Sequence, residues 1–130
     1  MMSATDSEQH VTTLLREIDT YLSGFDLAGV QDVRRGLARW GNGKHHAMTP
    51  RFLPPCAMLP EALSAMAHRP LADAITAVLP HLHWITYDAY PRADIGEAFA
   101  DGHAFASLVG EGAFRAADDY DLGLFVIAPN

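Results

Sequence analysis

The chain has a single cysteine, Cys56, in its 130 residues. One cysteine excludes an internal disulfide framework and is typical of a reducing compartment. The chain also lacks a run of about 18 apolar residues, the length that a membrane-spanning helix needs. Residues 1–10 are polar and contain Asp6 and Glu8, unlike the basic start and apolar centre of a secretory signal. We therefore expect a cytoplasmic protein.

Basic residues are also scarce. The chain has 9 Lys and Arg against 16 Asp and Glu, which gives a net charge of −7. Such a surface repels nucleic-acid phosphates and anionic membranes unless its basic side chains gather in one patch. The densest basic stretch, residues 34–44, is interpreted as a solvated helix face. The composition therefore predicts neither a nucleic-acid nor a membrane partner.

The motifs of several enzyme classes are absent. The chain has no glycine-rich phosphate loop, no GxSxG elbow and no HExxH pair. Cys56 follows two prolines and is interpreted as a small buried thiol, not as a nucleophile. The acidic run Asp118, Asp119 and Asp121 lacks the glycine turn and final glutamate of a calcium loop. We interpret it as a hairpin turn with solvated charge.

Helical periodicity dominates the first half. Apolar residues recur every three or four positions from Val11 to Leu22, with Asp6 or Ser7 as the predicted N-cap and Gly24 as the end.

Three more helices are predicted before residue 80. Residues 27–40 have one apolar face, slightly weakened by Gly29 and Gly36. Pro60 and Pro70 each begin a shorter helix, because proline fits a first turn. Residues 41–56 lack periodicity and are expected to form a connecting loop.

Strand-like patterns follow Pro80. Residues 83–87, 104–109 and 120–127 are rich in aromatic and branched side chains and are separated by Gly and Asp turns. Helices followed by antiparallel strands predict the α+β class. We divide the chain into a helical region, residues 1–80, and a region of opening strands, residues 81–130.

The last predicted strand runs almost to the C-terminus. An unpaired apolar strand leaves open backbone donors and acceptors, which proteins normally pair or cover. We therefore expect that the chain is an incomplete piece of a longer sheet.

The histidines are the most conspicuous candidates for chemistry, with seven in the chain. His45 and His46 are adjacent on a loop, so we expect them to be exposed. His81 and His83 would share one strand face and could form half a metal site. Because no other ligand stands at suitable spacing, we interpret them as surface histidines at a helix exit.

Five segments, in this order, resemble the N-terminal part of bacterial cupin-type dimethylsulfoniopropionate (DMSP) lyases. They are LPPC at residues 53–56, PLA at 70–72, LPHLHW at 79–84, HAFASLVG at 103–110 and LGLFVIAPN at 122–130.

The resemblance implies helices packed on a small cupin β-barrel that holds a divalent transition metal. It also implies cleavage of DMSP to dimethyl sulfide and acrylate by base-promoted β-elimination. In that family a His, a Glu four residues later, a Tyr two further on and a distant His hold the metal. The first ligand follows the position matched by Ala128 and Pro129, where this chain ends. We therefore assign no metal ligand and no catalytic residue here, and expect the metal only in the complete protein.

Four residues are candidates for lining the barrel pocket: His103, Phe105, Phe125 and Ile127. His103 begins a strand, where it could carry a proton or contact substrate, or serve only as a structural side chain. Alternation along the strands does not say which face points inward.

The function predicted from the sequence is thus the N-terminal part of a DMSP-lyase-like cupin, a carbon–sulfur lyase acting on a small DMSP-like substrate when complete. An alternative is a noncatalytic module that forms a homo-oligomer through its exposed C-terminal strand. A third is a degraded coding sequence without function.

Overall fold

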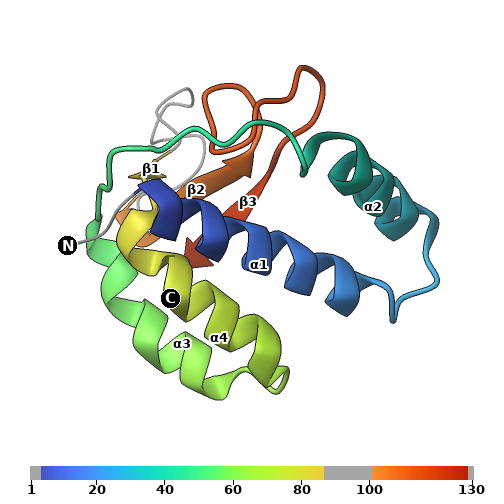
Figure 1. Cartoon of the computed structure of the whole chain (residues 1–130). Coiled ribbons are helices and arrows are strands. Elements are labelled where there is room, and N and C mark those ends of the chain that lie inside the picture. Colours follow the sequence, from blue (N-terminus) through green and yellow to red (C-terminus); the bar gives the residue numbers. More distant parts are fainter. Residues whose placement is uncertain (1–3, 87–100, 129–130) are drawn as a thin grey trace.

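Helices come first and a small sheet follows in the structure, a computed structural model that describes residues 4–86 and 101–128. The α-helices there are α1 (Ala4–Leu22), α2 (Ala28–Trp40), α3 (Leu59–Ala65) and α4 (Arg69–Val78). Two short 3-10 helices are η1 (Pro54–Met58) and η2 (Leu79–His81), and the strands are β1 (Trp84–Ile85), β2 (His103–Val109) and β3 (Leu122–Ile127). This arrangement confirms the predicted α+β class (Figure 1).

The long helix α1 lies beside α4 and buries the apolar stripe seen in the sequence (Figure 1). Val11 and Leu14 are completely buried. The predicted N-cap is wrong, because the helix begins at Ala4. Asp6 instead lies in the first turn, where its carboxylate favours the positive end of the helix dipole. Ser7 is buried.

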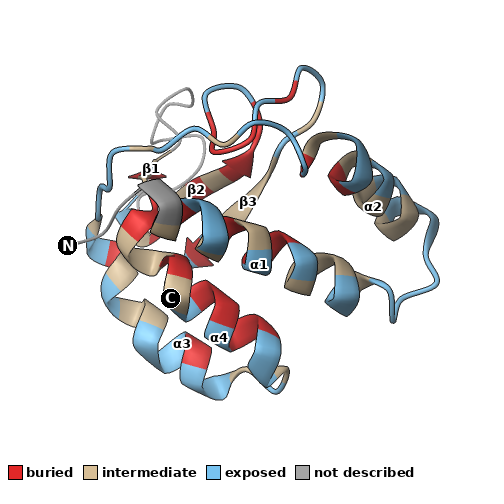
Figure 2. Ribbon diagram, viewed as in Figure 1, coloured by how far each residue is buried: buried red, intermediate tan, exposed pale blue. Residues whose placement is uncertain are grey.

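The helix α2 has Leu37 as its one buried residue, whereas much of α4 is buried (Figure 2). It is anchored by buried Leu37 and by Tyr120, whose hydroxyl donates a hydrogen bond to the Val33 carbonyl oxygen at 2.7 Å. The Tyr120 ring lies so close to Gly36 that a Cβ there would overlap it. Gly36 therefore allows a close approach, which the sequence pattern alone did not reveal.

The sheet is antiparallel with the order β1-β2-β3 among the described strands. Trp84 pairs with Ala106, and Ala104 pairs with Val126. These four residues are buried in the hydrophobic core together with residues from all four helices. Because side chains alternate along a strand, the neighbouring residues point to the opposite face of the sheet.

The predicted strands agree with β2 and β3 to within two residues, and β1 is shorter than residues 83–87. Residue 87 lies outside the described residues. The division of the chain near residue 80 stays a prediction; the core cluster contains residues from both sides of it. Within the described part, none of the helices combines the length and apolar character needed to span a membrane.

Candidate functional site

All four candidate pocket residues lie on one face of the sheet, opposite to the face that carries Trp84, Ala104 and Ala106. The strand register pairs His103 with Ile127 and Phe105 with Phe125. The Phe125 ring stacks on His103, with centroids 5.8 Å apart, and its centroid lies 6.1 Å from that of Phe105. Ile85 pairs with Phe105 and belongs to the same face. We call these five residues the outer sheet face.

Exposure differs across the outer sheet face. His103 is only 1% exposed, whereas Phe125 is 41% and Ile127 61% exposed. The register thus shows that the four side chains share one face. Their role as the lining of a barrel pocket stays a prediction.

An apolar groove of about 290 Å³ lies between α3 and β3. Phe125 and Ile127 line it, whereas His103 and Phe105 do not. Fully buried Trp84 also lines it, and its indole Nε1 has no hydrogen-bond partner within the described residues. A buried indole N–H normally finds an acceptor, so this one is an unsatisfied donor inside the core beside the groove.

The described residues do not assemble a metal site. In residues 4–86 and 101–128, no three His, Cys, Asp or Glu side chains come together as metal ligands would. A divalent transition metal needs three or four such ligands. The donor set around His103 therefore does not fit this metal, and we derive no chemical step through it.

The interpretation of His81 and His83 as surface histidines is wrong for His81. His81 is only 5% exposed, and its Nε2 lies 3.1 Å from Nδ1 of His10 on α1. Burial lowers the pKa of His81, and the nearby His10 lowers it further. The side chain of His83 bonds the Thr49 carbonyl oxygen at 2.7 Å. The two histidines therefore serve separate packing contacts and do not form half a metal site.

His45 is half-buried, contrary to the expectation that it is exposed, while His46 is exposed as predicted. The His45 ring stacks on Phe114, and His45 Nε2 lies 3.0 Å from Oγ of Ser7. The Nε–H of Arg115 donates to His45 Nδ1 at 3.3 Å. Since Nδ1 accepts, we assign the ring proton to Nε2, which then donates to Ser7.

The cluster of Ser7, His45 and Arg115 joins three distant parts of the chain. The sequence analysis did not predict it. Ser7 and His45 have the contact of a nucleophile and its base, but a base is activated by a carboxylate on its other nitrogen. Here that position holds the Arg115 cation. Burial lowers the pKa of His45, and Arg115 lowers it further, so the imidazolium that a base would form on taking the Ser7 proton is disfavoured here.

Acid should destabilise the fold through His45. Its folded pKa is lowered below the ordinary 6.5, so the unfolded chain binds the proton more readily. Stability is therefore full above pH 6.5 and is lost as the pH falls through the folded pKa. Urea unfolding between about pH 7.5 and about pH 5 should show this loss. His45→Gln should reduce the pH dependence, whatever its cost at the higher pH, and the part that remains comes from His81, whose pKa is lowered too.

The neighbouring His46→Gln is the matched control, because the His46 side chain is exposed. It should change the pH dependence much less than His45→Gln, because the His46 charge is only a minor cause of the lowered His45 pKa. Equal slopes for the two variants would contradict the assignment of His45 as the acid-sensitive group.

The structure also describes the acidic run and the single cysteine that the sequence analysis interpreted. Asp118, Asp119 and Asp121 are exposed, as predicted for solvated charge. Cys56 lies in η1 and is half-buried as a free thiol.

The model of the dimethylsulfoniopropionate lyase family matches residues 31–130. The chain belongs to the DMSP lyase family. The match begins within α2 and continues through β3, so it includes the whole outer sheet face but not α1. No curated protein matches this DMSP lyase family member.

A chain from the crystal structures of the DMSP lyases RdDddP and RnDddQII has a similar fold. The TM-score is 0.60 at 20% sequence identity. The likeness covers 95% of this DMSP lyase family member but 59% of the solved chain, so our chain spans about three fifths of that chain's length.

Proposed function

We propose that this chain supplies the helical region and the first strands of a cytoplasmic, cupin-type DMSP lyase. The family match and the similar fold support this proposal, since both include the strands that carry the outer sheet face. In this proposal further strands continue the sheet beyond β3 and close a barrel over that face. The metal ligands then come from outside the described residues.

The observation that carries the proposal is the aromatic character of the outer sheet face. DMSP bears a sulfonium cation at one end and a carboxylate at the other. A cation is attracted to the faces of aromatic rings. Phe105 and Phe125 lie on one face with ring centroids 6.1 Å apart, and Phe125 remains partly open. We assign these two rings to the sulfonium end of the substrate.

In the cleavage of DMSP, the outer sheet face only has to bind the substrate and exclude water. A base removes a proton from the carbon next to the carboxylate, the electron pair forms the C=C bond of acrylate, and the C–S bond breaks. The sulfur keeps its bonding pair and leaves as neutral dimethyl sulfide. Because positive charge on sulfur disappears, an apolar wall around it favours the leaving group. No residue of this chain is assigned as the base.

The test uses the polypeptide as its native source makes it. We expect a mass well above the 14.1 kDa of this chain, a bound divalent metal, and release of dimethyl sulfide from DMSP. A native mass of 14.1 kDa without dimethyl sulfide release would refute the proposal.

Phe125→Ala in that native protein should lower kcat/KM for DMSP by about 5- to 30-fold, because a desolvated cation–π contact contributes about 1–2 kcal/mol. Phe52→Ala is the control, since Phe52 is 60% exposed and does not line the groove. Equal activity of the two variants would remove Phe125 from the substrate site.

A second candidate function is self-association through β3. It is favoured by the 61% exposure of Ile127 and by the apolar groove beside this strand, which ends the described sheet. Sedimentation of the 130-residue chain should then show a concentration-dependent dimer that Ile127→Lys abolishes. A monomer at all concentrations would refute it.

A further inference from the structure

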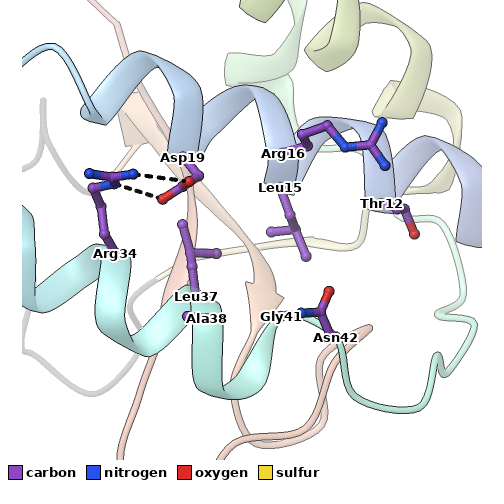
Figure 3. Close-up of a pocket in the computed structure, with 9 residues that line it drawn as sticks. All are labelled: Thr12, Leu15, Arg16, Asp19, Arg34, Leu37, Ala38, Gly41 and Asn42. Carbon is purple, nitrogen blue, oxygen red and sulfur yellow. Dashed lines mark hydrogen bonds and ion pairs between the residues drawn. The ribbon is translucent and has the colours of Figure 1, made fainter.

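A cleft of about 230 Å³ lies between α1 and α2, away from the outer sheet face. Figure 3 shows its two ends: Arg34 and Asp19 meet at one, while Thr12, Arg16 and Asn42 lie toward the other. The side chains of Leu15 and Leu37, both 6% exposed, lie between the ends. The cleft thus joins an apolar floor to polar side chains, the composition of a small-molecule site.

The carboxylate that lines the cleft is already neutralised. Asp19 accepts hydrogen bonds from Arg34 Nε at 2.9 Å and from its terminal nitrogen at 3.4 Å. This bidentate ion pair uses both oxygens of Asp19 and forms one end of the cleft. Asp19 makes its ion pair with Arg34 and none with Arg16.

Arg16 has no ion pair and no hydrogen bond within the residues that the structure describes. Its guanidinium carries five N–H donors in a planar fork that suits a carboxylate. Other exposed cations among the described residues, such as Lys44 and Arg51, are also without an ion pair, but Arg16 lines the cleft. The amide of Asn42 adds a further donor at the same end of the cleft.

A second cation lies directly behind this wall. Arg115 is only 4% exposed, and its two terminal nitrogens donate to the Gly41 carbonyl oxygen at 2.6 Å and to Thr12 Oγ1 at 2.8 Å. Gly41 and Thr12 both line the cleft. Arg115 makes no ion pair in the described part of the chain, although the negative charge of Glu8 favours its charged form. A buried cation of this kind favours an anion on the other side of the wall.

We propose that the α1–α2 cleft binds a small organic carboxylate. Its carboxylate group lies at the end formed by Thr12, Arg16 and Asn42, in front of Arg115. Its alkyl part packs on Leu15 and Leu37. The apolar floor distinguishes this ligand class from inorganic phosphate, which would leave those side chains uncovered. The proposal is independent of lyase activity, because the cleft contains no residue of the sheet.

The test is an NMR titration of the ¹⁵N-labelled 130-residue chain with sodium propionate at constant ionic strength. We expect saturable shifts of the Gly41 and Asn42 amide signals, and no such shifts with propionamide, the neutral isostere. Arg16→Gln should weaken propionate binding by about tenfold, the loss expected for charge-assisted hydrogen bonds. Arg39→Gln, an equal charge change on α2 outside the cleft, should leave the affinity unchanged.

Three outcomes would overturn the proposal. Equal binding of propionamide would show an apolar hollow without charge recognition. Binding of inorganic phosphate as tight as that of propionate would show a general anion site without a role for the floor. Equal affinities of the Arg16→Gln and Arg39→Gln variants would remove Arg16 from the site.

Discussion

Arg115→Met is expected to lower the free energy of unfolding by about 2–4 kcal/mol, because it leaves one buried partner and two half-buried partners without their donor. Arg115 bonds Gly41, Thr12 and His45, and thereby ties the segment between β2 and β3 to α1 and to the loop after α2. The largest cost arises at the buried Gly41 carbonyl oxygen, because water does not replace the lost donor there. Urea unfolding near neutral pH measures the loss.

Arg35→Met is the matched control. Arg35 pairs with Asp32 one turn earlier on α2, and both side chains are about 70% exposed. Such surface pairs contribute about 0–1 kcal/mol. If the two variants unfold at the same urea concentration, the hydrogen bonds of Arg115 do not join these segments in solution.

Gly36→Ala is expected to destabilise the protein by about 1–3 kcal/mol, although alanine normally favours a helix. The new methyl group would overlap the Tyr120 ring, which is held in place by its hydrogen bond to Val33. The conflict must push α2 away from this ring and disturb buried Leu37. Thermal or urea unfolding measures the effect.

Gly29→Ala provides the comparison within the same helix. A Cβ at Gly29 meets no atom within 4 Å, so this change should stabilise the protein by up to about 1 kcal/mol. Stabilisation by both substitutions would show that Tyr120 does not pack on α2.

The candidate site was predicted in part. His103, Phe105, Phe125 and Ile127 follow from strand patterns and a family resemblance, and the register shows that they share one face. The role of Arg115 was not predictable. It follows a turn at Gly112, and the acidic residues near it in the sequence, Glu111 and Asp118, are exposed and do not pair with it, so no local pattern signals its burial.

The histidines also show that local sequence patterns do not predict distant contacts. His81 and His83 are two residues apart, which suggests a shared role when the chain is read locally. In the structure His81 lies in η2 and contacts His10 on α1, whereas His83 contacts the loop at Thr49. The partners come from 71 and 34 residues away, so spacing between the two histidines carried no information about them.

The sequence by itself determined the α+β class, the main helices and strands, and the resemblance to DMSP lyases. These depend on the hydrophobic period, on turn residues and on short motifs that follow one another in a given order. Such features can be read from neighbouring residues. Only the tertiary structure decided which face holds Phe125, why Gly36 is glycine, and where the charge of Arg115 lies. Each of these depends on contacts between segments that are far apart in the chain, and such contacts are set by packing and strand register.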